Sequence, residues 1–326
     1  MININYLTAA NEWIKHTEGF SKASIFVHKN PDCDALGSAF ALARILRLNA
    51  FWLDVKIVGM NTLKQNDFKN FFEFSDEDVD LDFIKESVGF IVDTANADRV
   101  LSHLHTFCKK TILIDHHVKN PTFTDISYID DTSIAACEMI GLALKNSGLN
   151  YDLKTLEYLF IGLCTDSNRL MYDKVDDDTY NLMGWFYTNG VKHQKIYNQL
   201  YARSFQEVLF DAQLMTKVVI DDNIGYLLVQ PEWNEIYNFD RWGEKVNLLA
   251  SVREAKIWFV IYYVLEENNY KISLRSADYP IRLVAIEYHG GGHDLAAGCY
   301  LDSLDELPTF IQNLKNFIKN IDSKKE

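Results

Sequence analysis

Short apolar runs alternate with longer segments of helical periodicity through residues 1–190. Runs of β-branched and aromatic residues predict buried strands at 24–28, 54–59, 88–93 and 111–115. Apolar positions three or four residues apart predict helices over 35–48, 133–145, 153–163 and 176–187. Strands that alternate with helices in this way indicate a doubly wound parallel sheet, so we expect an α/β fold.

The pattern changes after a polar, helical-looking stretch at 191–206. Beyond it, strands are predicted at 218–220, 225–229, 257–264 and 270–274, and helices at 243–252, 280–288 and 307–321. A chain of 326 residues is long enough for two domains with separate cores. We therefore expect an N-terminal α/β domain at 1–190, a helical linker at 191–206 and a smaller mixed α/β domain at 207–326.

Side chains of the types that bind metal ions follow the predicted strands of the first domain. In chain order these residues are His28, Asp32, Asp34, Asp93, Asp115, His116 and His117, and Asp166 closes a later apolar run. Ligands of open α/β sheets bind beyond the carboxyl ends of the strands, so these side chains are expected to meet in one crevice. Such a set of carboxylates and imidazoles is the usual equipment of a two-metal hydrolase.

The first of these motifs also has a purely structural interpretation. Aspartate commonly caps helix N-termini, and Asp34 directly precedes the predicted helix at 35–48. A capped turn therefore explains the segment from His28 to Asp34 when it is taken alone. It does not explain why several strand ends converge on acids and imidazoles, since such a cluster needs a cation to neutralise it.

A glycine run in the second domain is a weaker signal. Gly290, Gly291 and Gly292 precede His293, and a glycine run allows backbone N–H groups to approach an anion closely. A simple turn is an equally good interpretation of the glycines alone. Arg275, Ser276 and His293 favour the anion site, because they add side-chain donors suited to phosphate.

Charge and composition narrow the classes of partner. The formal net charge is −14, and no Lys/Arg stripe appears, which argues against binding of long duplex nucleic acid. Solubility explains most of this acidity, and a small phosphorylated ligand neutralised by bound metal remains compatible with it. No apolar stretch approaches the roughly 20 residues of a membrane span, and the first 20 residues are too polar for a signal peptide. Five scattered cysteines favour a reducing cytoplasm over a disulfide framework.

Six motifs in order resemble those of a known family. They are His-Lys-Asn-Pro-Asp-Cys-Asp (28–34), Val-Asp-Thr (92–94), Asp-His-His (115–117), Gly-Leu-Cys-Thr-Asp (162–166), Ser-Leu-Arg-Ser (273–276) and Gly-Gly-Gly-His-Asp-Leu-Ala-Ala-Gly (290–298). Over nearly its whole length the chain resembles the DHH phosphoesterase family with its DHH-associated C-terminal domain. Its compact size resembles the stand-alone nanoRNase branch, which degrades short oligoribonucleotides and dephosphorylates 3′-phosphoadenosine 5′-phosphate (pAp).

The resemblance implies a role for each matching residue. His28, Asp32 and Asp93 match the first metal site, and Asp34, Asp93, His116 and Asp166 match the second, with Asp93 bridging. Asp93, Asp115, His116 and His117 form the implied catalytic set, in which Asp115 orients the histidines and His117 contacts the scissile phosphate. Arg275, Ser276, Gly290, Gly291, Gly292 and His293 match the substrate clamp. The implied cofactors are two divalent ions, with Mn²⁺ favoured by the mixed ligands and Mg²⁺ or Co²⁺ as substitutes.

Two departures from the family pattern concern substrate preference. Ser167-Asn168-Arg169-Leu170 stands where Thr-Gly-x-Phe is common, and His289 stands where a fourth glycine is frequent. The implied substrates are short oligoribonucleotides and pAp. The alternatives are a phosphodiesterase for linear or cyclic dinucleotides such as pApA or c-di-AMP, an inorganic pyrophosphatase, and a non-catalytic nucleotide-binding protein. A homodimer is compatible with the sequence.

Overall fold

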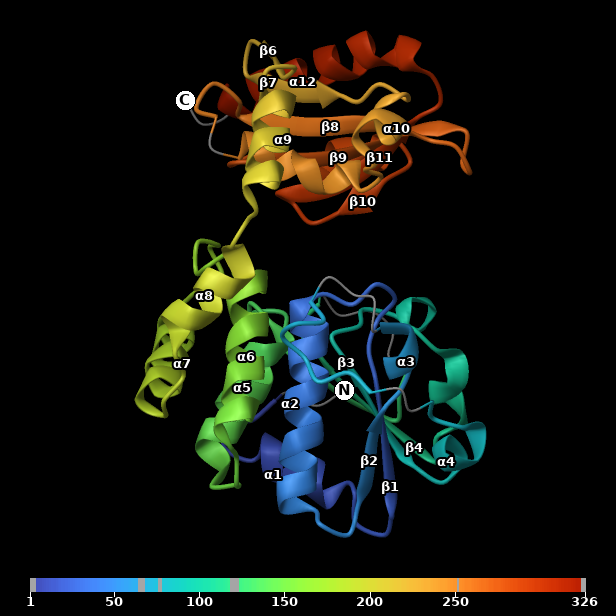
Figure 1. Ribbon diagram of the computed structural model, residues 1–326, viewed down its shortest axis with the longest axis vertical. Helices are drawn as coiled ribbons and strands as arrows, with labels where there is room; N and C mark the ends of the chain where they lie inside the picture. The colour runs from blue at the N-terminus through green and yellow to red at the C-terminus, as the bar shows by residue number, and fades with distance from the viewer. Residues whose placement is uncertain (1–3, 64–67, 76–77, 118–122, 251, 324–326) are drawn as a thin grey trace. The chain divides into compact units, whose positions relative to one another are not determined.

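The computed structural model describes residues 4–63, 68–75, 78–117, 123–250 and 252–323. The chain divides into two compact units, Met1–Tyr201 and Ala202–Glu326, which we call the N-terminal and the C-terminal unit (Figure 1). The boundaries that the sequence predicts at 190 and 206 stay a prediction. None of the described helices combines the length and the apolar character that a membrane span requires.

The N-terminal unit is built on a parallel sheet. Within the described residues its strands are β1 (Lys22–Phe26), β2 (Asp54–Ile57), β3 (Val88–Val92), β4 (Lys110–Asp115) and β5 (Ile126–Ile129), in the order β2-β1-β3-β4-β5. All four strand pairs are parallel. The helices are α1 (Ala9–Lys15), α2 (Cys33–Asn49), α3 (Met60–Leu63), α4 (Leu81–Lys85), α5 (Ala136–Ser147), α6 (Leu153–Asp166), α7 (Asp177–Thr188) and α8 (His193–Tyr201), with 3₁₀ turns η1 (Ala97–Arg99) and η2 (His103–Phe107).

Helices cover both faces of this sheet, which explains why its strands are almost continuously apolar. Ile25, Phe90 and Ile112 pack in the core that includes α2, α5 and α6. The alternate residues Phe26 and Ile91 pack with Phe83 and Ile84 of α4 on the other face. Figure 1 shows α2 and α4 on either side of the strands. The predicted doubly wound α/β fold is therefore confirmed. The sequence missed β5, because Pro121 to Tyr128 contains several polar residues that mask its short apolar pattern.

The C-terminal unit has a second, mixed sheet. Within the described residues its strand order is β10-β11-β9-β8-β7-β6, and only β7 and β8 run parallel. The strands are β6 (Val219–Asp221), β7 (Ile224–Leu228), β8 (Ile257–Val264), β9 (Asn269–Ser276), β10 (Gly291–Gly292) and β11 (Ala296–Leu301). The helices are α9 (Phe205–Met215), α10 (Trp233–Tyr237), α11 (Arg282–Glu287) and α12 (Leu307–Asp322), with 3₁₀ segments η3 (Trp242–Leu249) and η4 (Leu304–Glu306).

The two faces of the second sheet carry different cores. Phe259, Ile272 and Cys299 pack with α11 and α12 on one face. Trp258 and Val260 belong to the core that contains α10 and η3 on the other face. The predicted mixed α/β architecture is confirmed. The predicted helix at 243–252 is a 3₁₀ segment, and β10 and β11 were not predicted because glycine and alanine carry little strand signal.

Candidate metal centre

The predicted ligands of the first domain gather where the strand order reverses. The chain leaves β1 toward β2 on one side of the sheet and later adds β3, β4 and β5 on the other side. A crevice forms at such a switch point, outside the carboxyl ends of the strands. His28 follows β1 and Asp93 follows the neighbouring strand β3, so topology alone places both residues beside the crevice.

The loop after β1 caps the helix that follows it and still presents a carboxylate oxygen to the centre. Asp32 caps α2, since its Oδ1 accepts the N–H groups of Asp34 (3.0 Å) and Ala35 (3.1 Å). Its other oxygen, Oδ2, lies 3.9 Å from His28 Nε2. The capped turn that the sequence left as an alternative is therefore present, with Asp32 rather than Asp34 as the cap, and it leaves one oxygen of Asp32 directed toward His28.

Asp34 is buried and caps a distant helix. Its two carboxylate oxygens accept the N–H groups of Ala136 (2.7 Å) and Cys137 (2.8 Å), which begin α5. The cap residue Ala135 has no side chain that can do this. Asp34 Oδ2 also lies 3.9 Å from His116 Nε2. Burial and the charge of Asp93 raise the pKa of Asp34 to about 7.

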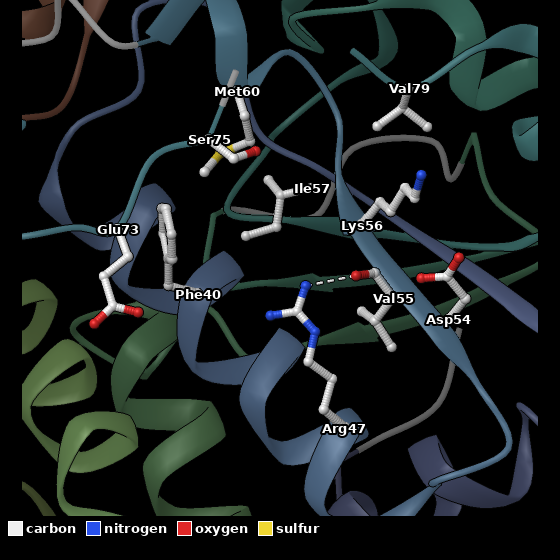
Figure 2. Close-up of a pocket in the computed structure, with 10 residues that line it drawn as sticks. All are labelled: Phe40, Arg47, Asp54, Val55, Lys56, Ile57, Met60, Glu73, Ser75 and Val79. Carbon is white, nitrogen blue, oxygen red and sulfur yellow. Dashed lines mark hydrogen bonds between the residues drawn. The ribbon is translucent and has the colours of Figure 1, made fainter. Parts of the chain in front are cut away.

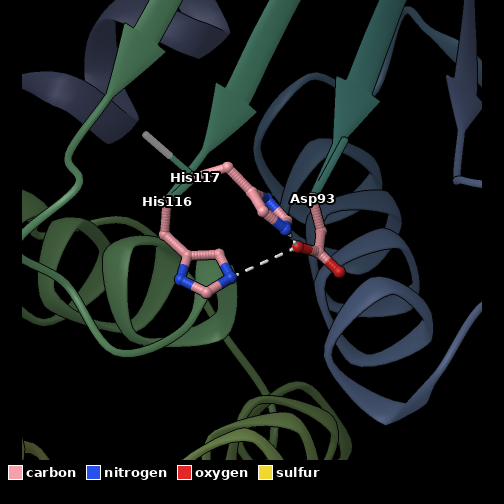
Figure 3. A group of neighbouring side chains, drawn as sticks. All are labelled: Asp93, His116 and His117. Atoms are coloured by element: carbon pink, nitrogen blue, oxygen red, sulfur yellow. Dashed lines mark ion pairs between the residues drawn. The ribbon is translucent and has the colours of Figure 1, made fainter. Parts of the chain in front are cut away.

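Asp93 lies between the two groups of ligands. Its Oδ2 is 3.5 Å from His28 Nε2. Its Oδ1 is 3.4 Å from His116 Nε2, the ion pair that Figure 3 shows. Its backbone has a left-handed conformation (φ +50°), which ends β3 and turns the side chain into the crevice. Asp93 Oδ1 is buried and accepts no hydrogen bond from the described residues. A buried carboxylate oxygen left in this way fits a bridging ligand between two cations.

The two histidines after β4 lie side by side. Their ring centroids are 4.8 Å apart, and His117 Nδ1 also comes within 3.7 Å of Asp93 Oδ1 (Figure 3). β4 ends at Asp115, so the rule that consecutive side chains of a strand point to opposite faces does not apply to His116 and His117. Asp115 Oδ1 accepts a hydrogen bond from His117 Nδ1 at 2.7 Å and so fixes the orientation of that ring.

Asp166 enters the centre from the C-terminus of α6, with Oδ2 3.5 Å from His116 Nε2. Burial and the charge of Asp34 raise its pKa well above the ordinary value. A carboxylate at the negative end of a helix is unfavourable unless a cation compensates it. Gly162 allows α6 to approach, because a Cβ there would lie 2.3 Å from Cys137 Sγ and 3.0 Å from Asp34 Cα.

The centre contains more carboxylates than histidines, and this excess of acidic groups shifts the pKa values of its side chains. Burial opposes the charged form of His28 and His116, yet the carboxylates close to each ring, Asp93 above all, outweigh it and raise the pKa of each to about 10. Burial also opposes ionisation of Asp93, but the two histidines hold its pKa below the ordinary range. The side chains are therefore arranged to hold positive charge at this point.

The donor set fits divalent metal ions. Among the described residues, three groups offer ligand atoms that all lie within 4.8 Å of one another: His28, Asp32 and Asp93; Asp34, His116 and Asp166; and Asp93, His116 and His117. These groups contain every predicted metal ligand. Mixed imidazole and carboxylate donors suit Mn²⁺ and related ions. The individual ligand roles stay predictions, as no ion defines them.

The predicted clamp residues all lie in the C-terminal unit. Arg275 is near the end of β9 and donates from Nη1 to its neighbour's carbonyl, Leu274 O, at 2.9 Å. Ser276 is buried, and its Oγ accepts the N–H of Tyr279 at 2.7 Å, so this hydroxyl oxygen is already used in a turn. Their role in substrate binding stays a prediction.

The glycine run forms a β-hairpin, so the structure agrees with the turn that the sequence left open. Gly291 and Gly292 pair with Gly298 and Ala297, and His293 N donates to Ala296 O (2.8 Å) to close the turn. Gly290 cannot be replaced without movement, because a Cβ there would lie 1.9 Å from Gly298 O. The hairpin holds His293 in an exposed turn at the edge of the sheet.

Both departures from the family pattern fall on left-handed backbone. Asn168 (φ +47°) and His289 (φ +58°) stand at positions where the pattern has glycine, the residue that adopts positive φ most readily. Asparagine and histidine are among the non-glycine residues that tolerate this region best. Asn168 and His289 therefore suit the left-handed conformation that the structure gives them. The sequence pattern contained this signal, since a glycine position already implies unusual φ.

A separate hollow lies beside the outer strand β2, and Figure 2 shows Arg47 reaching the carbonyl of Val55 there (2.5 Å). Its lining residues are Phe40, Arg47, Asp54, Val55, Lys56, Ile57, Met60, Glu73, Ser75 and Val79. It contains none of the predicted site residues.

His105, which polarity predicts to be exposed, is buried instead, because its Nδ1 pairs with Ser102 O at 3.0 Å and its ring packs on Phe26.

Comparisons with known proteins identify the family of the chain. The model of the DHH family, N-terminal domain, matches residues 22–163, and that of the DHHA1 domain matches residues 222–320. The uncharacterized protein MG371 of Mycoplasma genitalium is 31% identical over 306 residues, covering 93% of this chain and 94% of that protein. The bifunctional oligoribonuclease and PAP phosphatase NrnA of Mycoplasma genitalium is 26% identical, covering 95% and 98%. NrnA of Bacillus subtilis is 25% identical, covering 90% and 93%.

A solved structure supports the fold over the whole chain. The exopolyphosphatase-related protein from Bacteroides fragilis superposes with a TM-score of 0.80 and covers 98% of both chains, at 19% identity. At that identity the likeness concerns the fold alone. Together with the sequence matches and the gathered His and Asp side chains, it leads to one conclusion: the chain belongs to the DHH phosphoesterase family and carries a DHHA1 domain.

Proposed function

We propose that this protein is a two-metal phosphoesterase that hydrolyses short oligoribonucleotides to mononucleotides and dephosphorylates pAp. The observation that carries the proposal is the position of Asp93, with one oxygen toward His28 and the other toward His116. Such a carboxylate suits two neighbouring cations, and two-metal centres are a common solution for phosphoester hydrolysis. The names of the NrnA relatives support nucleotides as the substrate class.

The side chains of the centre then have distinct tasks. Two divalent ions, Mn²⁺ first and Mg²⁺ or Co²⁺ as substitutes, supply charge neutralisation and an activated water when bound. Asp93 would hold both ions, with His28 and Asp32 completing one site and Asp34, His116 and Asp166 the other. Asp115 keeps His117 Nδ1 occupied, so that Nε2 of this ring is directed to the scissile phosphate.

Free thiols at all five cysteines are compatible with action in the cytoplasm.

A panel of substrates tests this proposal. With Mn²⁺ we expect release of phosphate from pAp and of mononucleotides from oligomers of two to about five nucleotides. A 20-mer should be cleaved at least about tenfold more slowly per end, because a chain with net charge −14 and no basic track gains little counterion-release affinity from a long strand. Equal rates on a 5-mer and a 20-mer contradict the length preference.

The same panel separates the competing functions. Turnover of c-di-AMP or pApA alone indicates a dinucleotide phosphodiesterase, and turnover of pyrophosphate alone indicates a pyrophosphatase. Binding of nucleotides without turnover in any metal indicates a non-catalytic protein. The family assignment allows each of these outcomes, since MG371, at 31% identity, is uncharacterized whereas NrnA of the same organism is 26% identical.

Arg275→Ala tests the predicted clamp. If the guanidinium binds a distant phosphate, its loss removes charge-assisted hydrogen bonds worth roughly 1.5–3 kcal/mol, or about 10- to 150-fold in kcat/KM for pAp. The small ester bis-p-nitrophenyl phosphate carries no distant phosphate and should be affected far less. Steady-state kinetics on both substrates and a melting temperature decide the question. Equal loss on both substrates together with a lower melting temperature contradicts the clamp and assigns Arg275 a structural role.

A further inference from the structure

The segment directly after Asp166 has an unusual backbone. Asn168, Arg169 and Leu170 all have positive φ angles, of +47°, +63° and +64°. Asparagine tolerates this left-handed region, whereas arginine and leucine enter it at a cost in free energy, because their Cβ approaches a backbone oxygen. Residues held in such conformations gather at active sites and ligand-binding loops. Three in succession beside a predicted metal ligand therefore need a functional explanation.

Hydrogen bonds fix this turn to the helix that carries Asp166. The buried Oγ of Ser167 accepts the N–H of Leu170 at 3.1 Å. Arg169 N donates to Cys164 O, in the last turn of α6, at 2.8 Å. The backbone of Arg169 therefore has a defined position relative to the predicted ligand at the end of α6.

Two tyrosines support the side chain of Arg169. Its guanidinium carbon Cζ lies 5.1 Å from the centroid of the Tyr201 ring. Tyr201 stacks in turn on Tyr197, four residues earlier on α8, with ring centroids 5.7 Å apart and 27° between the planes. A guanidinium over an aromatic ring keeps its charge and loses part of its freedom, while the N–H groups at its edge stay available as donors.

These tyrosines lie beside the metal centre, within the N-terminal unit. Cys164 Sγ donates to the Tyr197 hydroxyl at 3.3 Å, which joins α8 to the last turn of α6. Burial is the main cause of the raised pKa of Tyr201, and the thiols of Cys164 and Cys33 add to it, so both lie near its hydroxyl. Cys33 stands between the two aspartates of the loop after β1 that are predicted ligands. The guanidinium of Arg169 therefore borders the centre where α6 and α8 meet.

The guanidinium of Arg169 is exposed and forms no ion pair with the described residues. Arg203, by contrast, is paired with Asp211. Asp166, three residues before Arg169, directs its carboxylate to His116 instead. An arginine that is oriented by an aromatic ring and lacks a carboxylate partner is prepared to bind an anion from solution.

The anion that suits this position is a phosphate group. A guanidinium donates two parallel hydrogen bonds to two oxygens of one phosphate. Divalent ions in the centre would add positive charge beside Arg169, and the resulting repulsion is relieved when an anion lies between the cations. The substrate phosphate of a two-metal phosphoesterase is such an anion.

We propose that Arg169 binds the non-bridging oxygens of the phosphate group that is hydrolysed, and that Tyr201 positions its guanidinium. This inference rests on the proposed function. It involves residues of the N-terminal unit alone. Arg169 therefore acts on every substrate, whereas the predicted clamp residue Arg275 acts only on substrates that carry a second phosphate.

The test compares the full-length wild type with Arg169→Ala, Arg169→Lys and the control Arg253→Ala, which removes an exposed arginine from the C-terminal unit. With Mn²⁺ we expect Arg169→Ala to lower kcat/KM about 10- to 100-fold on both pAp and bis-p-nitrophenyl phosphate, since charge-assisted hydrogen bonds are lost. Arg169→Lys should retain part of the activity, because lysine keeps the charge and loses the bidentate geometry. Arg253→Ala should behave as wild type.

Three further readouts distinguish a phosphate contact from a structural role. Titration calorimetry of the Mn²⁺-loaded proteins with inorganic phosphate should show a Kd about tenfold higher for Arg169→Ala than for the wild type. Added guanidinium ion should restore part of the activity of Arg169→Ala. Arg169→Gly should lose activity in the same way without a lower melting temperature, because glycine adopts positive φ without strain.

The support from Tyr201 is tested separately. Tyr201→Phe should bind inorganic phosphate more tightly than Tyr201→Leu, because only phenylalanine keeps a ring beneath the guanidinium. Unchanged phosphate binding in Arg169→Ala, a loss confined to pAp, or a loss with lower melting temperatures and no rescue overturns the inference while the proposed function stands. A wild-type protein that cleaves none of the nucleotide substrates overturns both.

Discussion

Replacing Asp93 by asparagine is expected to lower kcat on pAp and dinucleotides by at least about 10³-fold while the protein stays folded. The carboxylate offers one oxygen to each side of the centre, at 3.5 Å from His28 Nε2 and 3.4 Å from His116 Nε2. An amide keeps the shape of the group but carries no charge and has only one good acceptor atom. It can neutralise neither cation and cannot bridge the two.

The measurement combines turnover, bound metal per chain and thermal unfolding. Asp130→Asn is a matched control, because Asp130 also follows a strand of this sheet, β5, and accepts a hydrogen bond from the Tyr6 hydroxyl at 2.7 Å, outside the predicted ligand set. We expect the control to lose some stability and retain its activity. Near-normal turnover of Asp93→Asn with both metals still bound would falsify the two-metal assignment.

The strand ends of the N-terminal unit were predictable from sequence because the chemistry is local. A buried parallel strand is a continuous apolar run, and the first acid or histidine after it marks the edge of the sheet. His28, Asp93 and Asp115 were found in this way, and the structure brings them to one crevice. Asp166 belongs to a helix, so its position depended on the order of motifs and on the close approach that Gly162 allows.

Other features depend on tertiary structure that no local pattern contains. The use of Asp34 as a cap for α5 joins residues about a hundred positions apart, so it could not be read from the loop itself. The glycine run gave no strand signal, although β11 pairs with it and with β9.

Two departures from the family pattern, at Asn168 and His289, show another limit of prediction from sequence. Asn168 and His289 differ from glycine in chemistry, which suggested a change in substrate preference. The backbone shows that both sit at positive φ, where each is a tolerated replacement. The positive φ places a conformational requirement on both positions, and an effect on substrate preference stays a prediction. The sequence shows which residue stands at each position, whereas the φ angle shows the backbone conformation that this residue has to adopt.

Removing the metals is expected to abolish activity, and adding Mn²⁺ back is expected to restore it with release of protons. His28 and His116 have ordinary pKa values near 6.5, which the surrounding carboxylates raise to about 10 against the effect of burial. At pH 8 both rings therefore hold a proton, whereas a metal ligand must be a neutral imidazole. Binding of Mn²⁺ at this pH should release roughly two protons per chain.

The sign of the pH dependence follows from the same shifts. A raised histidine pKa stabilises the folded, chelator-treated protein below pH 6.5, and this contribution is lost as the pH rises through about 10. Its melting temperature should therefore fall between pH 7 and 10, while the affinity for Mn²⁺ rises over the same range. Titration calorimetry in buffers of different ionisation enthalpy measures the protons, and His103→Asn, an exposed histidine on η2, is the control. A binding enthalpy that is the same in every buffer, or activity that survives exhaustive chelation, contradicts a centre in which these two histidines exchange protons for metal.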